Sequence, residues 1–447
     1  MLYLHINERV NDKKLHKMER KIDKLLITWK ESRSRLPLIL QGARQVGKTF
    51  TLLQFGKTNY QNVAYFNFEN NPELNMIFAK DISPAQLLPQ LMLLSNQTIF
   101  EENTLVIFDE IQACERALTS LKYFAELAPG YHVVAAGSLL GVAVNRKQYS
   151  FPVGKVQIQQ LYPMDFEEFL WAMGNKKGVA IILDCFENNS ECALHTHFLE
   201  LFKLNLGLGG MPQVVSEYVK NSDFNFVVST QKNILNSYVA DMAKYASPME
   251  TLRIMAAFNS IPSQLTKQNH KFQYNLIKSG ARAKAYEAPL DWLKASGIIQ
   301  KVEKCHTPML PIVAYSVPDF FKVYMSDTGL LCSKSGLNSQ SLLLQPLQLE
   351  GIKGALAENY VASALQVNGY TPYYWESEGK AEIDFIIQDK QGEITPVEVK
   401  SSENVRAKSL SHYIQKYKPK KAYKVSAKNF GHENNLISIP LYATFCI

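Results

Sequence analysis

The sequence feature that most constrains the fold of this 447-residue chain is an eight-residue string, GARQVGKT, at 42–49. It matches the pattern GxxxxGK[ST] at each fixed position, follows a strand-like run at 38–40 and opens a helical stretch. Glycine is needed in such a loop because only a backbone without Cβ can wrap so that successive N–H groups converge on phosphate oxygens. The string therefore predicts a phosphate-binding loop at the edge of a parallel α/β sheet.

Individual residues of this loop have separate expected roles toward ATP. Lys48 is expected to reach the β- and γ-phosphates, and Thr49 to place its hydroxyl on Mg²⁺. The N-terminus of the following helix adds partial positive charge. The residues expected to contact the nucleotide are Gly42, Ala43, Arg44, Gln45, Val46, Gly47, Lys48, Thr49 and Phe50.

A second string, LVIFDE at 105–110, is typical of a buried strand that delivers carboxylates at its C-terminal edge. Asp109 is expected to hold Mg²⁺ through water. Glu110 is expected to polarise the attacking water, which is the step that separates hydrolysis from binding. The pairing of this strand with a complete phosphate loop makes the signal specific.

Two further polar residues end neighbouring strands. Ser138 follows the strand-like run 133–136 and is a candidate sensor of the γ-phosphate or of the water, although a serine in a turn is the alternative. Asn67 lies near the end of the run 63–68, and we expect it within reach of Glu110 as a candidate switch.

The length of the chain predicts two to four domains. Strand-like runs at 38–40, 63–68, 105–108, 132–135 and 156–160 alternate with helical stretches, which indicates a parallel sheet covered on both faces. We expect a basic N-terminal helix within 1–35, a P-loop core at 36–161 and a helical lid at 162–247. Helices followed by short strands at 298–302, 312–316 and 323–325 suggest a winged helix at 248–335. A last α/β domain is expected at 350–447.

Charge and cysteine content indicate which partners and which cellular compartment to expect. Residues 1–35 carry ten Lys/Arg against five Asp/Glu, and residues 401–447 carry eight against two. The basic C-terminal segment suits a phosphate backbone, or it is a solvated face. Six scattered cysteines fit reduced thiols in a cytoplasm, and the apolar runs are shorter than the roughly 20 residues of a membrane helix.

The C-terminal domain carries a second set of candidate catalytic residues. Glu358 lies in a helical run, Asp384 in a strand, and Glu398 and Lys400 at the end of another strand, on one face because side chains alternate. Asp384 and Glu398 are expected to bind Mg²⁺, Lys400 to orient or activate water, and Glu358 to complete the shell. The alternative is a salt-bridged cluster in a domain that holds DNA or has ceased to cut.

With these residues identified, the chain resembles the prokaryotic AAA+-like ATPases that carry a DUF4143 segment and are related to signalling ATPases. The strings GARQVGKT (42–49), LVIFDEIQ (105–112), AAGSLLG (135–141) and FPVGKVQIQQLYPMDFEEFL (151–170) carry the resemblance. It implies a nucleotide sheet of order 5-1-4-3-2, a helical lid and a winged helix. Gly209–Pro212 also resembles the GxP turn of such ATPases, which implies that Pro212 contacts the nucleotide.

The order of Glu358, Asp384, Glu398 and Lys400 resembles the PD-(D/E)xK nuclease fold, close to the type in Holliday-junction resolvases. An arginine finger has three candidates, Arg146, Arg253 and Arg282, with nothing to choose among them.

Two functions remain open at this point. One is an ATPase that couples turnover to metal-dependent cleavage or remodelling of DNA. The other is a nucleotide-operated switch whose winged helix and last domain bind DNA or a protein without cutting. The expected cofactors are ATP and Mg²⁺. The expected partners are DNA, a protein partner through the winged helix and further copies of the chain, with no membrane.

Overall fold

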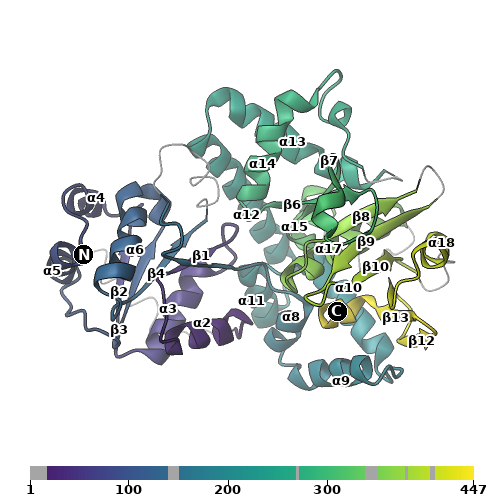
Figure 1. Cartoon of the computed structure of the whole chain (residues 1–447), viewed down its shortest axis with the longest axis horizontal. Coiled ribbons are helices and arrows are strands. Elements are labelled where there is room, and N and C mark those ends of the chain that lie inside the picture. The colour runs from purple at the N-terminus through teal and green to yellow at the C-terminus, as the bar shows by residue number, and fades with distance from the viewer. Residues whose placement is uncertain (1–17, 139–150, 268–270, 338–349, 378–380, 403–407) are drawn as a thin grey trace.

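The computed structural model describes residues 18–138, 151–267, 271–337, 350–377, 381–402 and 408–447. The described chain divides into an N-terminal lobe built on one sheet and a larger lobe built on helices and a second sheet (Figure 1). Helices α8 to α12 lie between the two sheets in sequence and connect the lobes.

The five-stranded sheet of the N-terminal lobe has the order β2-β3-β4-β1-β5, with all neighbours parallel. This confirms the predicted order 5-1-4-3-2. The strands are β1 (Leu38–Gln41), β2 (Asn62–Asn67), β3 (Thr104–Asp109), β4 (His132–Gly137) and β5 (Gln157–Gln160).

Strands β3 and β4 are buried along their whole length. Their apolar runs predict this, because a strand covered by helices on both faces has no side exposed to water. One face packs on α2 (Ile22–Glu31) and α3 (Lys48–Asn59). The other face packs on α4 (Pro72–Phe78), α5 (Pro84–Ser95) and α6 (Glu115–Leu127), which follows the short helix η1 (Ile111–Ala113).

The N-terminal helix is shorter than expected. We expected a basic helix within 1–35; residues 1–17 lie outside the described residues, and in the described part α2 begins only at Ile22. Before it, the N–H of Arg20 bonds to the Asp23 carboxylate, and the Arg20 side chain is held by the N-terminal lobe, so residues 18–20 leave the helical path.

The stretch from 162 to 247 is helical, as predicted. Its helices are α8 (Phe166–Ala172), α9 (Lys176–Glu187), α10 (His195–Leu208), α11 (Pro212–Asn221) and α12 (Phe224–Tyr245). Asp165 and Glu168 form a capping box that starts α8. Pro212 occupies the first position of α11, where its missing N–H costs no hydrogen bond.

Helices α13 (Pro248–Leu265) and α14 (Ala283–Ala295), separated by the short helix η2 (Tyr274–Leu276), precede a hairpin of β6 (Ile299–Cys305) and β7 (Ser316–Met325). The strand predicted at 312–316 is wrong, because Ile312–Tyr315 form the short helix η3. That turn buries Ile312, whose N–H donates to the Gln388 side chain. The winged helix remains a prediction.

The hairpin is one end of an eight-stranded mixed sheet of order β12-β13-β11-β10-β9-β8-β6-β7. The boundary predicted near 335–350 therefore falls within one sheet in space, since β6 pairs in parallel with β8. The remaining strands are β8 (Tyr373–Glu376), β9 (Glu382–Gln388), β10 (Ile394–Val399), β11 (Ala422–Ser426), β12 (Gly431–Glu433) and β13 (Leu436–Pro440).

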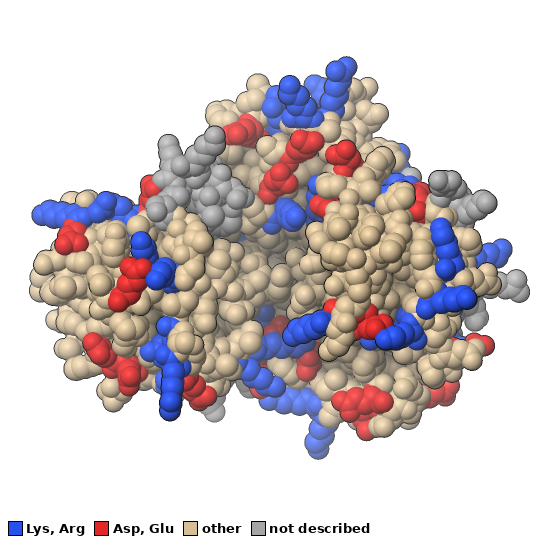
Figure 2. Space-filling model, in the orientation of Figure 1, with Lys and Arg blue, Asp and Glu red and all other residues tan. Residues whose placement is uncertain are grey.

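Helices complete this second lobe. They are α15 (Thr328–Lys334), α17 (Glu350–Val367), α18 (Lys408–Tyr417) and the short η5 (Leu441–Cys446). Within the described ranges no helix is long and apolar enough to cross a membrane. All six cysteines are free thiols. Basic and acidic side chains are interspersed over the face in Figure 2.

Candidate functional site

The phosphate loop wraps between β1 and α3 in a conformation that requires glycine. Gly42 has φ of 151°, and a Cβ on it would lie 2.2 Å from the carbonyl oxygen of Leu161. Gly47, at the N-terminus of α3, has φ of 97°. Both values lie in the region that L-residues avoid, so the fixed glycines of the string have a direct backbone cause.

Lys48 is buried at the start of α3, and its ammonium group donates to the carbonyl oxygens of Gly42 and Ala43, each at 2.9 Å. Burial lowers the pKa of Lys48 to about 8, although the carboxylates of Glu110 and Asp109 act against that shift. A desolvated cation at the start of a helix and beside the phosphate loop fits a phosphate ligand.

Thr49 and Asp109 meet at the end of β3, where the Thr49 hydroxyl donates to Oδ2 of Asp109 over 2.9 Å. The Tyr65 hydroxyl, from β2, donates to the same oxygen over 2.7 Å. A hydroxyl and a carboxylate beside a phosphate loop are the ligands that Mg²⁺ prefers, so Thr49 and Asp109 fit the expected metal.

Glu110 directly follows β3 in a left-handed backbone conformation, with φ of 50°, that points to local strain at a functional position. Its Oε2 accepts a hydrogen bond from Gln112 and a long one of 3.5 Å from Ser138. Burial raises the pKa of Glu110, and the Gln112 hydrogen bond opposes the shift. A carboxylate with a raised pKa near phosphate-binding groups suits a general base.

Asn67 does not bond to Glu110. It pairs with Asp109 across β2 and β3, but its amide donates to the Tyr65 hydroxyl over 3.2 Å and its oxygen accepts from the N–H groups of Glu69 and Asn70. Gln112 makes the contact with Glu110 that we expected of Asn67. A switch role for Asn67 would therefore act through Tyr65 and Asp109.

Lys48, Thr49 and Glu110 line one cleft of about 570 Å³, a size typical of small-molecule sites. Pro212 lies on its far wall, and a Cβ on Gly47 would sit 3.5 Å from its ring. The turn before α11 thus brings the predicted proline against the phosphate loop. Lining residues that sequence reasoning had selected are Arg44, Gln45, Gly47, Lys48, Thr49, Phe50, Glu110, Ser138 and Pro212.

The phosphate loop is also held by α12. Arg44 pairs with Asp241, the Tyr238 hydroxyl donates to the Arg44 carbonyl over 3.3 Å, and the Gln45 amide donates to Ser237 over 3.1 Å. Of the arginine-finger candidates, Arg146 lies outside the described residues, whereas Arg253 and Arg282 are exposed and do not line the cleft. Arg44 does line the cleft.

The C-terminal candidates gather around the middle of the second sheet. Glu358, on α17, accepts from the Tyr324 hydroxyl and pairs at 2.9 Å with Lys322, a buried lysine on β7. Lys322 also pairs at 2.7 Å with Glu382 on β9. Burial acts to lower the pKa of Lys322, but Glu358 and Glu382 outweigh it and the pKa is raised.

Asp384, Glu398 and Lys400 lie on the adjacent strands β9 and β10. Asp384 accepts from the N–H of Val399 over 2.7 Å, and Lys400 pairs with Glu398 at 2.7 Å. Burial raises the pKa of Asp384, and the negative charges of Glu358 and Glu398 add to it. Burial likewise raises the pKa of Glu398, against the attraction of Lys400.

Two features of this cluster bear on the expected metal. Oε2 of Glu398 is buried without a hydrogen-bond partner in the described part of the chain. Such an oxygen can take up a proton or bind a cation. However, no three His, Cys, Asp or Glu side chains among the described residues are placed to hold a metal ion together. Mg²⁺ is often held by one or two carboxylates and water, so Asp384 and Glu398 remain compatible with it.

Comparison with known families divides the chain into three matched segments. Residues 34–170 match a family model described as AAA domain. Residues 34–170 form an AAA-type P-loop domain. Residues 199–341 match a domain of unknown function, DUF8612, and residues 353–442 match another, DUF4143. The expected DUF4143 segment is thus present, but it covers only the last domain and not the β6–β7 region.

No curated protein matches the sequence. Solved structures similar in fold include a Walker-type ATPase of Pyrococcus abyssi, with 17% identity, a TM-score of 0.45 and coverage of 72% of this chain and 97% of that one. The RuvB Holliday junction branch migration motor of Thermotoga maritima is 14% identical, with a TM-score of 0.30 and coverage of 64% and 89%. The ORC1 protein of Aeropyrum pernix in complex with DNA is 11% identical, with a TM-score of 0.30 and coverage of 73% and 94%. At TM-scores this low, the likenesses transfer neither a ligand nor an activity.

Several residues of the nucleotide site and of the C-terminal cluster were missed by sequence reasoning. Tyr65 could have been found, because it lies two positions before Asn67 and so shares its face of β2. Gln112 lies within the string LVIFDEIQ itself. Arg20, Asp241 and Lys322 are brought in from distant segments, and no local pattern marks them.

Proposed function

We propose that the chain is an ATPase in which Glu110 activates water, and that its nucleotide cycle controls a metal-dependent site that cleaves DNA in the C-terminal lobe. The observation that carries the ATPase is the convergence of Lys48, the Thr49–Asp109 pair and Glu110 on one cleft. When bound, the metal would neutralise phosphate charge. Lys48 would bind phosphate, and Glu110 would take the proton of the water.

The ATPase proposal is tested with two variants. Glu110→Gln should bind ATP as the wild type does and lose turnover by about a hundredfold or more, because it removes the base and keeps the shape. Lys48→Ala should lose binding. Glu126→Gln, an exposed change on α6, is the control. Normal turnover in Glu110→Gln would overturn the assigned role.

The DNA-cleavage proposal is supported by charge. Four carboxylates, those of Glu358, Glu382, Asp384 and Glu398, face two lysines, Lys322 and Lys400, which leaves the cluster short of positive charge. A divalent cation would supply that charge and polarise a phosphodiester. Lys400 would orient the attacking water beside Glu398.

Cleavage is assayed with Mg²⁺ or Mn²⁺ on branched, single-stranded and duplex DNA. Asp384→Asn and Lys400→Ala should abolish any cutting, whereas Lys390→Ala, an exposed lysine in the turn between β9 and β10, should not. Loss of cutting only in the first two would place the chemistry at this cluster.

A regulatory switch that does not cut is the second candidate. It is favoured by the path between the two sites. The Pro212 ring lies beside Gly47, where an added Cβ would be 3.5 Å from it, and Gly210 bonds to Asp327. The strand that ends just before Asp327 carries Tyr324, which bonds to Glu358. If the wild type cleaves none of these DNAs in either metal, the switch is the better description.

A further inference from the structure

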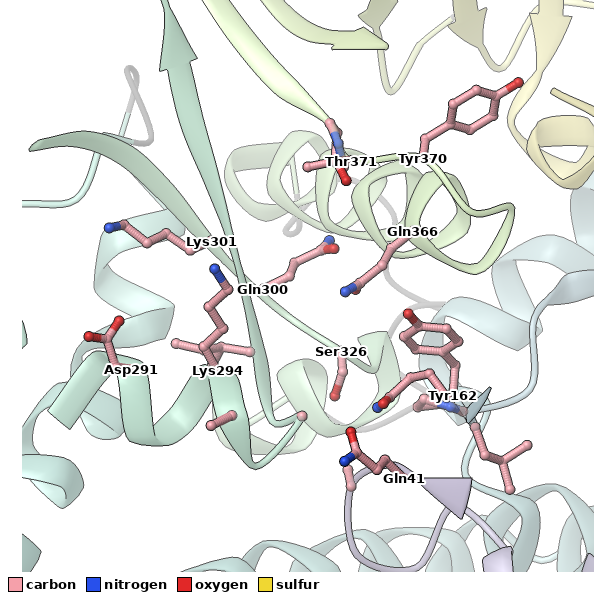
Figure 3. Close-up of a pocket in the computed structure, with 18 residues that line it drawn as sticks. Gln41, Tyr162, Asp291, Lys294, Gln300, Lys301, Ser326, Gln366, Tyr370 and Thr371 are labelled. Carbon is pink, nitrogen blue, oxygen red and sulfur yellow. The ribbon is translucent and has the colours of Figure 1, made fainter. Parts of the chain in front are cut away.

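A second cleft, of about 700 Å³, lies between the two lobes. Figure 3 shows its walls: the end of β1 and the segment after β5 on one side, the end of α14 and the start of β6 on another, and the end of α17 with the following loop on the third. No residue that lines it also lines the nucleotide cleft. It is therefore a separate space, built by all three matched segments of the chain.

The cleft is lined mainly by side-chain amides, two lysines and phenols. Four glutamines line it, Gln41, Gln160, Gln300 and Gln366, together with Tyr162 and Tyr370. The glutamine amides and the tyrosine hydroxyls can each donate and accept hydrogen bonds, so the cleft offers both kinds of group to a ligand.

Gln300 gives the sharpest indication that a ligand completes the site. It is only 5% exposed, and its Nε2 has no hydrogen-bond partner in the part of the chain that the structure describes. A buried donor without a partner lowers the stability of the fold, because it has lost its hydrogen bonds to water. A ligand that offers an acceptor oxygen or nitrogen would remove that cost.

Lys294 supplies the charge. It is exposed at the end of α14 and makes no ion pair within the described residues. Lys301, also in the lining, lies over the Phe321 ring and pairs with Glu303 at 3.9 Å. The cleft contains a single carboxylate, Asp291, among its lining residues. With two lysines against one carboxylate, the charges of the lining favour an anionic ligand, and its amides favour one that also carries hydrogen-bond donors and acceptors.

We propose that this cleft binds a nucleotide unit of a nucleic-acid strand, with a phosphate on Lys294 and an acceptor on the base or sugar at Gln300. Base edges present the same mixed donors and acceptors as glutamine amides, and bases stack on tyrosine rings. An acidic peptide satisfies the lysine and could pair with the amides through its backbone, but it offers no flat ring to stack on Tyr162 or Tyr370. The inference rests on the proposed action on DNA and names where the strand lies.

The position of the cleft links it to the nucleotide site. Gln41 and Ala43 flank Gly42 of the phosphate loop, and a Cβ on Gly297 would lie 3.1 Å from the backbone nitrogen of Ala43. The phosphate loop therefore forms part of both sites. Affinity for the strand should differ between protein saturated with ADP and protein saturated with a non-hydrolysable ATP analogue.

The experiment measures binding of a labelled single-stranded oligodeoxynucleotide to the full chain by fluorescence anisotropy over a range of salt. Lys294→Ala should weaken binding about tenfold and reduce the salt slope by about 1, because one phosphate contact is lost. Lys284→Ala, an exposed lysine on the same helix outside the cleft, is the matched control and should leave binding unchanged.

Gln300→Met separates a binding role from a structural one. It should weaken strand binding about fivefold, yet keep or raise the thermal midpoint, because an unsatisfied amide is replaced by an apolar side chain of similar size. A core residue that served stability alone would show the reverse. A second arm uses deoxythymidine monophosphate with the phosphate loop saturated by ADP, to distinguish a strand from a free nucleotide.

Equal strand binding by the wild type, Lys294→Ala and Gln300→Met would overturn this inference. The cleavage proposal would not be affected, because the Asp384→Asn variant tests it separately. Binding of the monophosphate but not the strand, lost in Lys294→Ala, would support a nucleotide site and count against action on DNA. Binding of polyglutamate with the same dependence on Lys294, and of neither nucleotide probe, would overturn the inference in favour of an acidic polypeptide.

Discussion

The carboxylate of Asp327 accepts a hydrogen bond of 2.6 Å from the backbone N–H of Gly210. Asp327 lies between β7 and α15, and Gly210 lies in the turn that leads to Pro212 and the phosphate loop. The Asp327 carboxylate also accepts a hydrogen bond of 2.8 Å from the backbone N–H of Leu330. One buried carboxylate thus joins the turn before Pro212 to the strand that bears Lys322 and Tyr324.

This carboxylate predicts a pH dependence of stability. Burial raises the pKa of Asp327 to about 6, with the backbone hydrogen bonds opposing the shift. The folded protein therefore binds the proton more tightly than the unfolded chain does. The stabilisation is complete below the unfolded pKa and is lost as the pH rises through about 6, by roughly 3 kcal/mol for this group.

The test compares wild-type and Asp327→Asn protein by urea unfolding between about pH 4 and pH 7. The variant should have the lower free energy of unfolding over this whole pH range, because its amide has one acceptor oxygen in place of two. The difference from the wild type should shrink as the pH rises, because only the wild type loses stability when Asp327 ionises. Asp184→Asn, an exposed change on α9, gives the baseline. A difference that stays constant with pH would contradict the assignment.

The buried pair of Lys322 and Glu358 predicts a rescue experiment. The two side chains are 1% and 7% exposed, so Lys322→Met leaves buried carboxylates without their cation and should cost about 3–5 kcal/mol of stability. The double variant with Glu358→Gln should recover a substantial part, because the amide can still accept from Tyr324 and carries no charge. Chemical denaturation of the single and double variants measures both. If the second change adds to the loss, the charge argument is wrong.

Much of the AAA domain could be predicted because its signals are local. The glycines of 42–47, the apolar run of β3 and the carboxylates at its end are written in consecutive residues, and their spacing fixes which edge of the sheet they share. The strand order came from resemblance and was confirmed by the pairing. The strand expected at 312–316 failed because Ile312 packs in a turn that a short apolar run cannot distinguish from a strand.

What could not be predicted depends on contacts between distant segments. The β6–β7 hairpin reads as the wing of a separate domain, yet its pairing with β8 is visible only in space. Lys322 looks like an ordinary strand lysine until Glu358 and Glu382 are brought around it. The interlobe cleft has no sequence signature, because its glutamines come from four separate elements.

Tyr65 predicts an effect on metal use. Its hydroxyl shares Oδ2 of Asp109 with Thr49, so Tyr65→Phe should loosen the carboxylate while leaving the cleft's shape intact. We expect ATP turnover to fall about tenfold and half-maximal activity to require more Mg²⁺, as is usual when an outer hydrogen bond to a metal ligand is removed. Tyr60→Phe, whose hydroxyl bonds to His132 away from this site, is the matched control. An unchanged Mg²⁺ requirement would assign Tyr65 to structure alone.

Arg20 predicts that the segment before α2 supports the phosphate loop. Its guanidinium donates to the carbonyl of Val46 at 3.1 Å and of Tyr162 at 2.7 Å, and pairs with Glu168 at 3.1 Å. Lysine carries the same charge but cannot span these acceptors with a planar fork. Arg20→Lys should therefore raise the KM for ATP about tenfold and leave kcat nearly unchanged, because the loop loses support for binding but Glu110 is untouched. The exposed change Arg33→Lys should alter neither value. A fall in kcat with constant KM would mean that Arg20 acts on the chemical step instead, through the loop's position relative to Glu110.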